Sequence, residues 1–113
     1  MSSDLRTLKP QVARAARELV RIARLVGYRP TVTSTFRSRS QQARLYRTWL
    51  AGGSRFPALP PGRSLHEARV AFDLVTEPYD VEALRDLGSV WESWGGEWGG
   101  DKDPVHFQAR RFA

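Results

Sequence analysis

The sequence has no cysteine, two lysines and two histidines among its 113 residues. Without cysteine, neither a disulfide nor a thiolate metal site can form, so any bound metal must be held by histidine and carboxylate side chains. No apolar run is long enough to span a membrane, and the first residues lack the basic start and apolar stretch of a secretory signal. We therefore expect synthesis in the cytoplasm without a signal peptide, and a fold stabilised by packing or by such a metal.

Positive charge exceeds negative charge by 6, and arginine supplies nearly all of the excess. A basic surface favours polyanions such as nucleic acid, an anionic membrane or an anionic wall polymer. Ordinary solubility charge and codon bias explain the same excess, so charge alone identifies no partner. Nothing in the sequence demands an assembly larger than a monomer.

The chain fits one domain, residues 1–113, with a core over about 10–108 and no internal repeat or interdomain linker. The predicted elements are a helix at 10–26, a strand at 29–36, a helix that Ser38 and Gln41 open as a capping box, an irregular loop at 52–63, a strand at 68–75, a helix capped by Asp80, and a strand at 105–108. This order predicts a small α+β domain with helices packed on one side of a short, mostly antiparallel sheet.

Apolar residues at helical spacing define the expected buried faces of the three helices. They are Val12, Ala16, Leu19, Val20, Ala23 and Val26 in the first, Leu45, Tyr46, Trp49 and Leu50 in the second, and Val81, Leu84, Leu87, Trp91 and Trp94 in the third. Another face of the first helix carries Arg14, Arg17, Arg21 and Arg24. That stripe could grip an anionic polymer, but a solvated outer face is the favoured interpretation.

Both histidines lie in segments that also carry a carboxylate: His66 precedes Asp73, and Asp103 precedes His106. Two imidazoles and one carboxylate make a three-ligand set for a catalytic zinc and leave a fourth position for water. His66 and Asp73 are 7 residues apart, so one regular strand would direct them to opposite faces. They converge only if a turn follows His66 and the strand begins later. The alternative is a surface loop histidine and a half-buried strand histidine without a metal role.

Three blocks of sequence form a longer pattern. They are Thr33 to Ser38 with Gln41 and Leu45-Tyr46, then Ser64-x-His66 with Ala71-x-Asp73, then Trp94 to Asp101 with Asp103 to Phe107. The blocks resemble, in order, the SGYRS-x-x-x-Q-x-x-LY, SxHxxGxAxD and WGGDW-with-acid-and-histidine motifs of the zinc D-alanyl-D-alanine carboxypeptidases of the VanY type. That family also contains the L-alanyl-D-glutamate endopeptidases of phage endolysins. The resemblance covers nearly the whole chain and implies a Hedgehog/D-Ala-D-Ala peptidase-like fold.

The resemblance also implies a set of roles when it is carried over by position. His66, Asp73 and His106 would hold one zinc ion per chain. Asp103 would be the general base that activates water and later returns a proton to the leaving amine.

Three further residues are implied to face the substrate. Arg37 would stabilise the polarised carbonyl or bind a substrate carboxylate, for which its planar charge is suited. Ser64 would contact the substrate or support a ligand, and Trp98, in a glycine-rich flexible turn, would form a wall of the groove. Gln41 would hold the loop of Arg37 or point to solvent.

Two positions depart from the family's pattern. Arg69 stands at the motif glycine, which questions the backbone shape of the turn after His66. Asp103 stands where carboxypeptidase members more often have glutamate, a feature associated with the endopeptidase branch. Because aspartate is shorter, Glu97 and Asp101 are alternative candidates for the base.

The resemblance therefore implies a peptidoglycan stem-peptide hydrolase, with L-alanyl-D-glutamate cleavage slightly favoured over D,D-carboxypeptidase activity. Such an enzyme would act on the cell wall, after a phage-type release if it lacks a leader, and anionic wall polymers would be further partners. One alternative is a catalytically inactive, metal-containing wall-binding module. A less favoured one is an arginine-rich nucleic-acid binder, which accounts for the charge but not for the three blocks.

Overall fold

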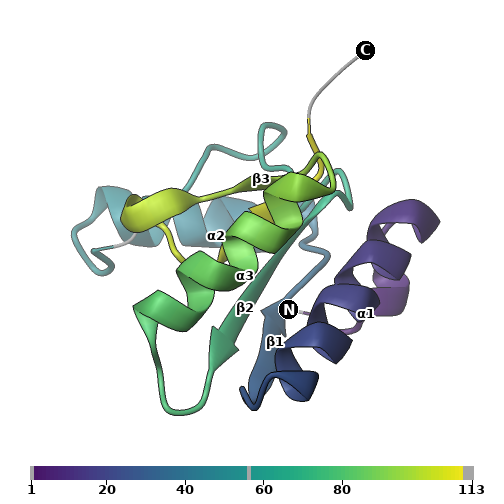
Figure 1. Ribbon diagram of the computed structural model, residues 1–113. Coiled ribbons are helices and arrows are strands. Elements are labelled where there is room, and N and C mark those ends of the chain that lie inside the picture. Colours follow the sequence, from purple (N-terminus) through teal and green to yellow (C-terminus); the bar gives the residue numbers. More distant parts are fainter. Residues whose placement is uncertain (1, 56, 111–113) are drawn as a thin grey trace.

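Helices and short strands alternate along the chain in the computed structural model, which describes residues 2–55 and 57–110. Figure 1 shows their arrangement. The elements are η1 (Leu5–Thr7), α1 (Pro10–Leu25), β1 (Pro30–Ser34), α2 (Arg39–Leu50), β2 (Ala71–Thr76), α3 (Val81–Ser93), β3 (Glu97–Trp98), η2 (Gly100–Lys102) and β4 (His106–Gln108). Within the described ranges, no helix has both the length and the apolar character needed to cross a bilayer.

The capping residues predicted from the sequence begin the helices as expected. Ser38 accepts from the backbone N–H of Gln41, whose side chain returns to the backbone N–H of Ser38, and this completes the capping box of α2. Asp80 accepts from the backbone N–H groups of Glu82 and Ala83 at the start of α3. Pro10 occupies the first turn of α1.

All neighbouring strands pair antiparallel, in the order β1-β2-β4-β3. In β2 the side chains alternate between two environments, since Phe72 and Leu74 are buried whereas Asp73 and Val75 are only partly buried. The register places Asp73 directly opposite His106 of β4. The predicted α+β domain on an antiparallel sheet is thus confirmed, and its central strands carry both the core and the candidate site.

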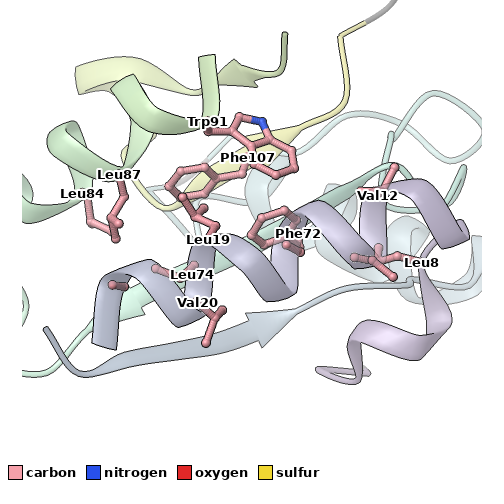
Figure 2. Packing of buried hydrophobic residues seen from close by; sticks show 13 residues of the cluster. Leu8, Val12, Leu19, Val20, Phe72, Leu74, Leu84, Leu87, Trp91 and Phe107 are labelled. Atoms are coloured by element: carbon pink, nitrogen blue, oxygen red, sulfur yellow. The ribbon is translucent and has the colours of Figure 1, made fainter. Parts of the chain in front are cut away.

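The core lies between α1, α3 and one face of the sheet (Figure 2). Phe72 and Phe107 stack with ring centroids 5.4 Å apart, and Trp91 meets Phe72 edge-on at 5.2 Å. Aromatic pairs in these geometries stabilise a core beyond the burial of their surface alone. The large buried side chains come from residues far apart in the sequence, namely Leu19, Phe72, Leu74, Leu84, Leu87 and Phe107. The other sheet face, with Asp73 and His106, borders a pocket together with α2.

Three apolar residues expected to be buried lie in solvent instead. Val26 is 62% exposed, Leu50 is 62% exposed and Trp94 is 44% exposed. Val26 and Trp94 are C-cap residues, one position beyond the helices whose periodicity predicted their burial. The arginine stripe of α1 is exposed as predicted.

The indole ring of Trp98 packs directly against Gly88 of α3, so the Gly88→Ala variant tests that contact. A Cβ at position 88 would lie 2.4 Å from Cδ2 of Trp98. Alanine favours a helix by about 1 kcal/mol over glycine, yet we expect a net loss of about 1 to 2 kcal/mol in the free energy of unfolding, because overpacking outweighs that gain. Urea denaturation measures it, with Ser89→Ala on the exposed side of α3 as the matched control. A Gly88→Ala variant that is as stable as the parent, or more stable, would contradict close packing of Trp98 on Gly88.

Candidate metal centre

His66, Asp73 and His106 converge on one point beside the sheet. Nε2 of His66 and Nδ1 of His106 each lie 3.4 Å from Oδ1 of Asp73. One ligand atom from each residue lies within 4.8 Å of the other two. The β2–β4 register brings Asp73 and His106 together. His66 reaches them because a turn follows it and β2 begins only at Ala71, which is the irregularity that the sequence required.

The remaining nitrogen of each imidazole is held by a separate acceptor. Nδ1 of His66 lies 2.8 Å from the backbone carbonyl oxygen of Thr35. Nε2 of His106 lies 2.7 Å from Oε1 of Gln108. A ring nitrogen that donates to such an acceptor carries the proton, so the nitrogen that faces Asp73 keeps its lone pair in a neutral ring. Both histidines are therefore oriented as metal ligands commonly are.

The donor set and its spacing fit a zinc ion. Zinc takes imidazole nitrogen and carboxylate oxygen at about 2.0 to 2.2 Å, which in a tetrahedron separates neighbouring ligand atoms by about 3.3 Å. The two 3.4 Å separations to Asp73 match that edge. Three protein ligands leave a position for substrate, as catalytic rather than structural zinc sites do.

Opposite charges at the centre support each other. Burial alone would raise the pKa of Asp73, but in the metal-free protein hydrogen bonds from His106 and His66 in their protonated, charged forms hold it well below its usual range. Burial alone would lower the pKa of His106, yet hydrogen bonds to Asp73 and Gln108 raise it. Asp73 is thus ionised over the whole range in which the protein would work.

Arg37 lies beside the ligand set and is fixed by two contacts. Its Nη2 donates to Oδ2 of Asp73 at 3.1 Å, and its Nη1 donates to Oε1 of Gln42 at 3.3 Å. Burial lowers the pKa of Arg37, and the charges of Asp73 and Asp103 oppose that shift. The side chain of Arg37 is only 15% exposed.

Gln42, which the sequence did not single out, is the glutamine that contacts Arg37. Gln41, expected to hold the loop of Arg37 or to point to solvent, closes the predicted capping box with Ser38. Gln42 is buried, accepts from Arg37, and donates through Nε2 to the backbone carbonyl of Leu59 at 2.7 Å. The available signal was that α2 has few apolar residues to fill its inward face. A glutamine one turn into the helix is then a candidate for that buried position.

A pocket of about 790 Å³ opens over the three candidate ligands. Ser64, Arg37 and Asp103 also line it, and the predicted irregular loop at 52–63 forms one wall, through residues of 54–59. Residue 56 lies outside the described ranges. Ser64 is buried, and its hydroxyl accepts from the backbone N–H of His66 at 3.1 Å. Ligand pockets of enzymes fall in this range of volume.

Of the three acids considered as the base, Asp103 is the one among the residues that line the pocket. Burial raises the pKa of Asp103, the charge of His106 lowers it, and the charge of Asp73 raises it further. Asp101 instead forms an ion pair with Arg85 of α3 at 2.8 Å. Glu97 belongs to β3, on the edge of the sheet.

Trp98 does not reach this pocket, in contrast to the expectation that it forms a groove wall. It lies in β3 rather than in a flexible turn, packs on Gly88, and donates from its indole N–H to the backbone carbonyl of Pro104 at 2.7 Å. The glycines around it permit close packing rather than mobility, since a Cβ at Gly99 would lie 2.2 Å from the backbone oxygen of Asp103. Trp98 thus supports the segment that carries Asp103.

Comparison with known families gives one match that covers most of the chain. The VanY family, D-alanyl-D-alanine carboxypeptidase, matches residues 5–95. No curated protein sequence is similar enough to this chain to count as a match.

Solved structures with the same fold include three kinds of peptidase. The vancomycin-resistance D,D-pentapeptidase VanY of a VanB-type cassette, in complex with Zn(II), has a TM-score of 0.72 at 20% identity, over 90% of this chain and 72% of its own. The LD-carboxypeptidase LdcB has a TM-score of 0.73 at 18% identity, over 91% of this chain and 65% of its own. The L-Ala D-Glu endopeptidase ChiX of Serratia marcescens has a TM-score of 0.71 at 25% identity, over 94% of this chain and 83% of its own.

Proposed function

The chain belongs to the VanY family of D-alanyl-D-alanine carboxypeptidases, and from this membership we propose that it is a zinc-dependent peptidase that cleaves peptidoglycan stem peptides. The observation that carries the proposal is the convergence of His66, Asp73 and His106 at the base of a pocket. A relative of the same fold was solved with Zn(II), which supports zinc as the metal. The proposed unit is one peptidase domain with one zinc ion.

Each pocket residue has a task in this proposal. Bound zinc supplies Lewis acidity, which polarises the scissile carbonyl and lowers the pKa of water toward about 7. Asp103 accepts the proton of the attacking water and passes it to the leaving amine, and its raised pKa suits that transfer. Arg37 binds the carbonyl oxygen or a substrate carboxylate, while Ser64 contacts the peptide beside His66.

The turn after His66 argues against the inactive wall-binding module. Arg69, at the position of the family's glycine, adopts a φ of 64°. That is the left-handed region which glycine occupies without strain and other residues enter rarely. The turn therefore keeps the shape that glycine would give it, and the departure in sequence leaves the backbone that directs His66 intact.

Two observations favour the bond between L-alanine and D-glutamate as the target. The similar structures include an L-Ala D-Glu endopeptidase, of which this chain covers 83%. Asp103 supplies a short carboxylate where the carboxypeptidases of the family more often have glutamate. D,D-carboxypeptidase activity is the second candidate, supported by the match to the family as a whole.

Digestion of purified peptidoglycan tests the proposal. The zinc-loaded protein and its Asp103→Ala variant are incubated with walls of several peptide chemistries, and the released fragments are analysed by mass spectrometry. New L-alanine and D-glutamate ends from the parent alone would support the endopeptidase, whereas free D-alanine would support the carboxypeptidase. No product from folded, zinc-loaded parent would overturn the peptidase and favour a binding module.

Zinc affinity is expected to fall in acid because a proton competes for His106. The pKa of this imidazole is raised above its ordinary value of 6.5, while that of Asp73 is lowered. Below the pKa of His106, the association constant should fall at least about tenfold per pH unit, since at least one proton is displaced from the two imidazoles per metal bound. Competition with a chromophoric chelator between pH 5 and 8 measures this. A flat profile down to pH 5 would show that His106 is not a ligand.

A further inference from the structure

The segment that precedes α1 is hydrogen bonded to Thr35, the residue whose carbonyl contacts the candidate ligand His66. The backbone carbonyl of Ser2 accepts from the backbone N–H of Thr35 at 2.8 Å. The hydroxyls of Thr7 and Thr35 are hydrogen bonded at 2.9 Å. These contacts join residues far apart in sequence, so residues 2–9 are packed as part of the site's support rather than as a loose end.

Thr35 connects this segment to a candidate ligand. It is fully buried, and its N–H and its hydroxyl are both bonded to the segment. Its carbonyl is the acceptor that holds Nδ1 of His66 at 2.8 Å. The group that fixes the orientation and tautomer of His66 is therefore itself fixed by Ser2 and Thr7.

Arg69 holds the same segment from the other side. Its Nη1 donates to the backbone carbonyl of Thr7 at 2.9 Å, and its own backbone carbonyl accepts from the N–H of Lys9 at 3.0 Å. Its guanidinium carbon lies 3.9 Å from the ring centroid of Phe36, the neighbour of Thr35. A glycine at this position could make the backbone contact alone.

We propose that Arg69 and residues 2–9 form a clamp that positions the imidazole of His66 through Thr35. This inference rests on the proposed function, because it assigns the clamp to a metal ligand. It explains why an arginine occupies a backbone conformation that suits glycine: the side chain gains contacts with Thr7 and Phe36 that offset the strain of a positive φ. Arg69 and Thr7 act through Thr35 and are positioning residues.

The Arg69→Gly variant separates the clamp from the turn. Glycine accepts a φ of 64° without strain, so the turn after His66 keeps its shape while the guanidinium contacts are lost. We expect the zinc dissociation constant to rise about tenfold, the lower end of the effects seen when outer contacts of metal ligands are removed. Arg69→Lys, which restores a cation and a donor, should recover part of the loss. Arg63→Gly, at an exposed arginine of the same loop, should leave zinc affinity unchanged.

A readout on the metal-free protein makes the test independent of zinc. The parent should show an Nδ1–H proton of His66 that exchanges slowly in NMR spectra, because it is bonded to the carbonyl of Thr35. Arg69→Gly should broaden or lose this signal while the rest of the spectrum stays folded. A merely structural role would lower thermal stability without changing either this signal or the zinc affinity of the folded protein.

Thr7→Val provides a second route to the same contact. It removes the hydroxyl bonded to Thr35 with little change in shape, and a loss of about threefold in zinc affinity is expected, with recovery in Thr7→Ser. Unchanged affinity and an unchanged Nδ1–H signal in both Arg69→Gly and Thr7→Val would overturn the clamp. If the parent binds no zinc while Arg69→Gly and Thr7→Val lose the Nδ1–H signal that the parent shows, the proposed metal site is overturned and the clamp on His66 remains supported.

Discussion

The Asp103→Asn variant should bind zinc as the parent does and hydrolyse peptidoglycan peptides at least about 10³-fold more slowly, within the range attributed to general acid–base catalysis. Asparagine keeps the size of the side chain but cannot accept the proton of the attacking water. Asp103 lines the pocket and is not one of the three converging donors, so chemistry rather than metal binding should suffer. Steady-state kinetics together with the zinc content of each preparation measures the effect, which should appear in kcat more than in KM.

Asp101→Asn is the matched control, since it makes the same change two residues earlier. Asp101 pairs with Arg85 on the surface of α3, so its loss should change activity by less than about threefold. The reverse result, an active Asp103→Asn and an inactive Asp101→Asn, would transfer the role of base to Asp101. Loss of zinc from Asp103→Asn would show that Asp103 belongs to the ligand set.

Replacement of Asp73 should produce the other large effect, the loss of the metal centre itself. Asp73→Asn keeps the shape of the side chain, but an amide has one acceptor oxygen and cannot replace both carboxylate oxygens that contact His66, His106 and Arg37. We expect zinc affinity to fall more than about 100-fold, because a carboxylate ligand is replaced by a neutral, weaker donor. Chelator competition measures the loss, and activity should disappear with the metal.

The same variant should also be less stable without zinc. Arg37 loses its partly buried ion-pair partner and keeps the charge of Asp103 nearby, which costs about 1 to 3 kcal/mol. Because the pKa of Asp73 is lowered on folding, its stabilising effect is present above its ordinary pKa of 3.8 and fades as the pH falls below that value. The difference in unfolding free energy between parent and variant should therefore shrink in strong acid. Asp86→Asn, at an exposed carboxylate that accepts from Tyr28, is the control and should cost under about 1 kcal/mol. A metal-free Asp73→Asn as stable as the parent at neutral pH would contradict a favourable role of the buried carboxylate.

The convergence of His66, Asp73 and His106 could be expected mainly from the resemblance to VanY-type peptidases, whose three blocks the sequence contains in order, whereas local patterns predicted the elements around them. Capping residues fixed the starts of the helices, and the odd separation of His66 and Asp73 demanded a turn that the structure contains. These are short-range constraints, which a single sequence expresses directly.

The errors concern side-chain contacts that local sequence patterns do not specify. Gln42 rather than Gln41 meets Arg37, because the rotation of α2 about its axis decides which of two adjacent glutamines faces inward. Trp98 turned toward α3 because Gly88, ten residues earlier, leaves room for its ring. Periodicity specifies a face to within about one residue, whereas such contacts depend on the tertiary position of the partner.

The alternation of side chains along β2 restricts where residues can be inserted into or deleted from this chain. Phe72 and Leu74 enter the core while Asp73 and Val75 border the pocket, so one inserted or deleted residue would exchange the two sets. Both packing and catalysis would fail together. Insertions and deletions should be better tolerated outside the sheet, for example in the pocket wall formed by residues of 54–55 and 57–59. Exchange of that loop would therefore be expected to change what the pocket accepts while leaving in place the paired strands that carry Asp73 and His106.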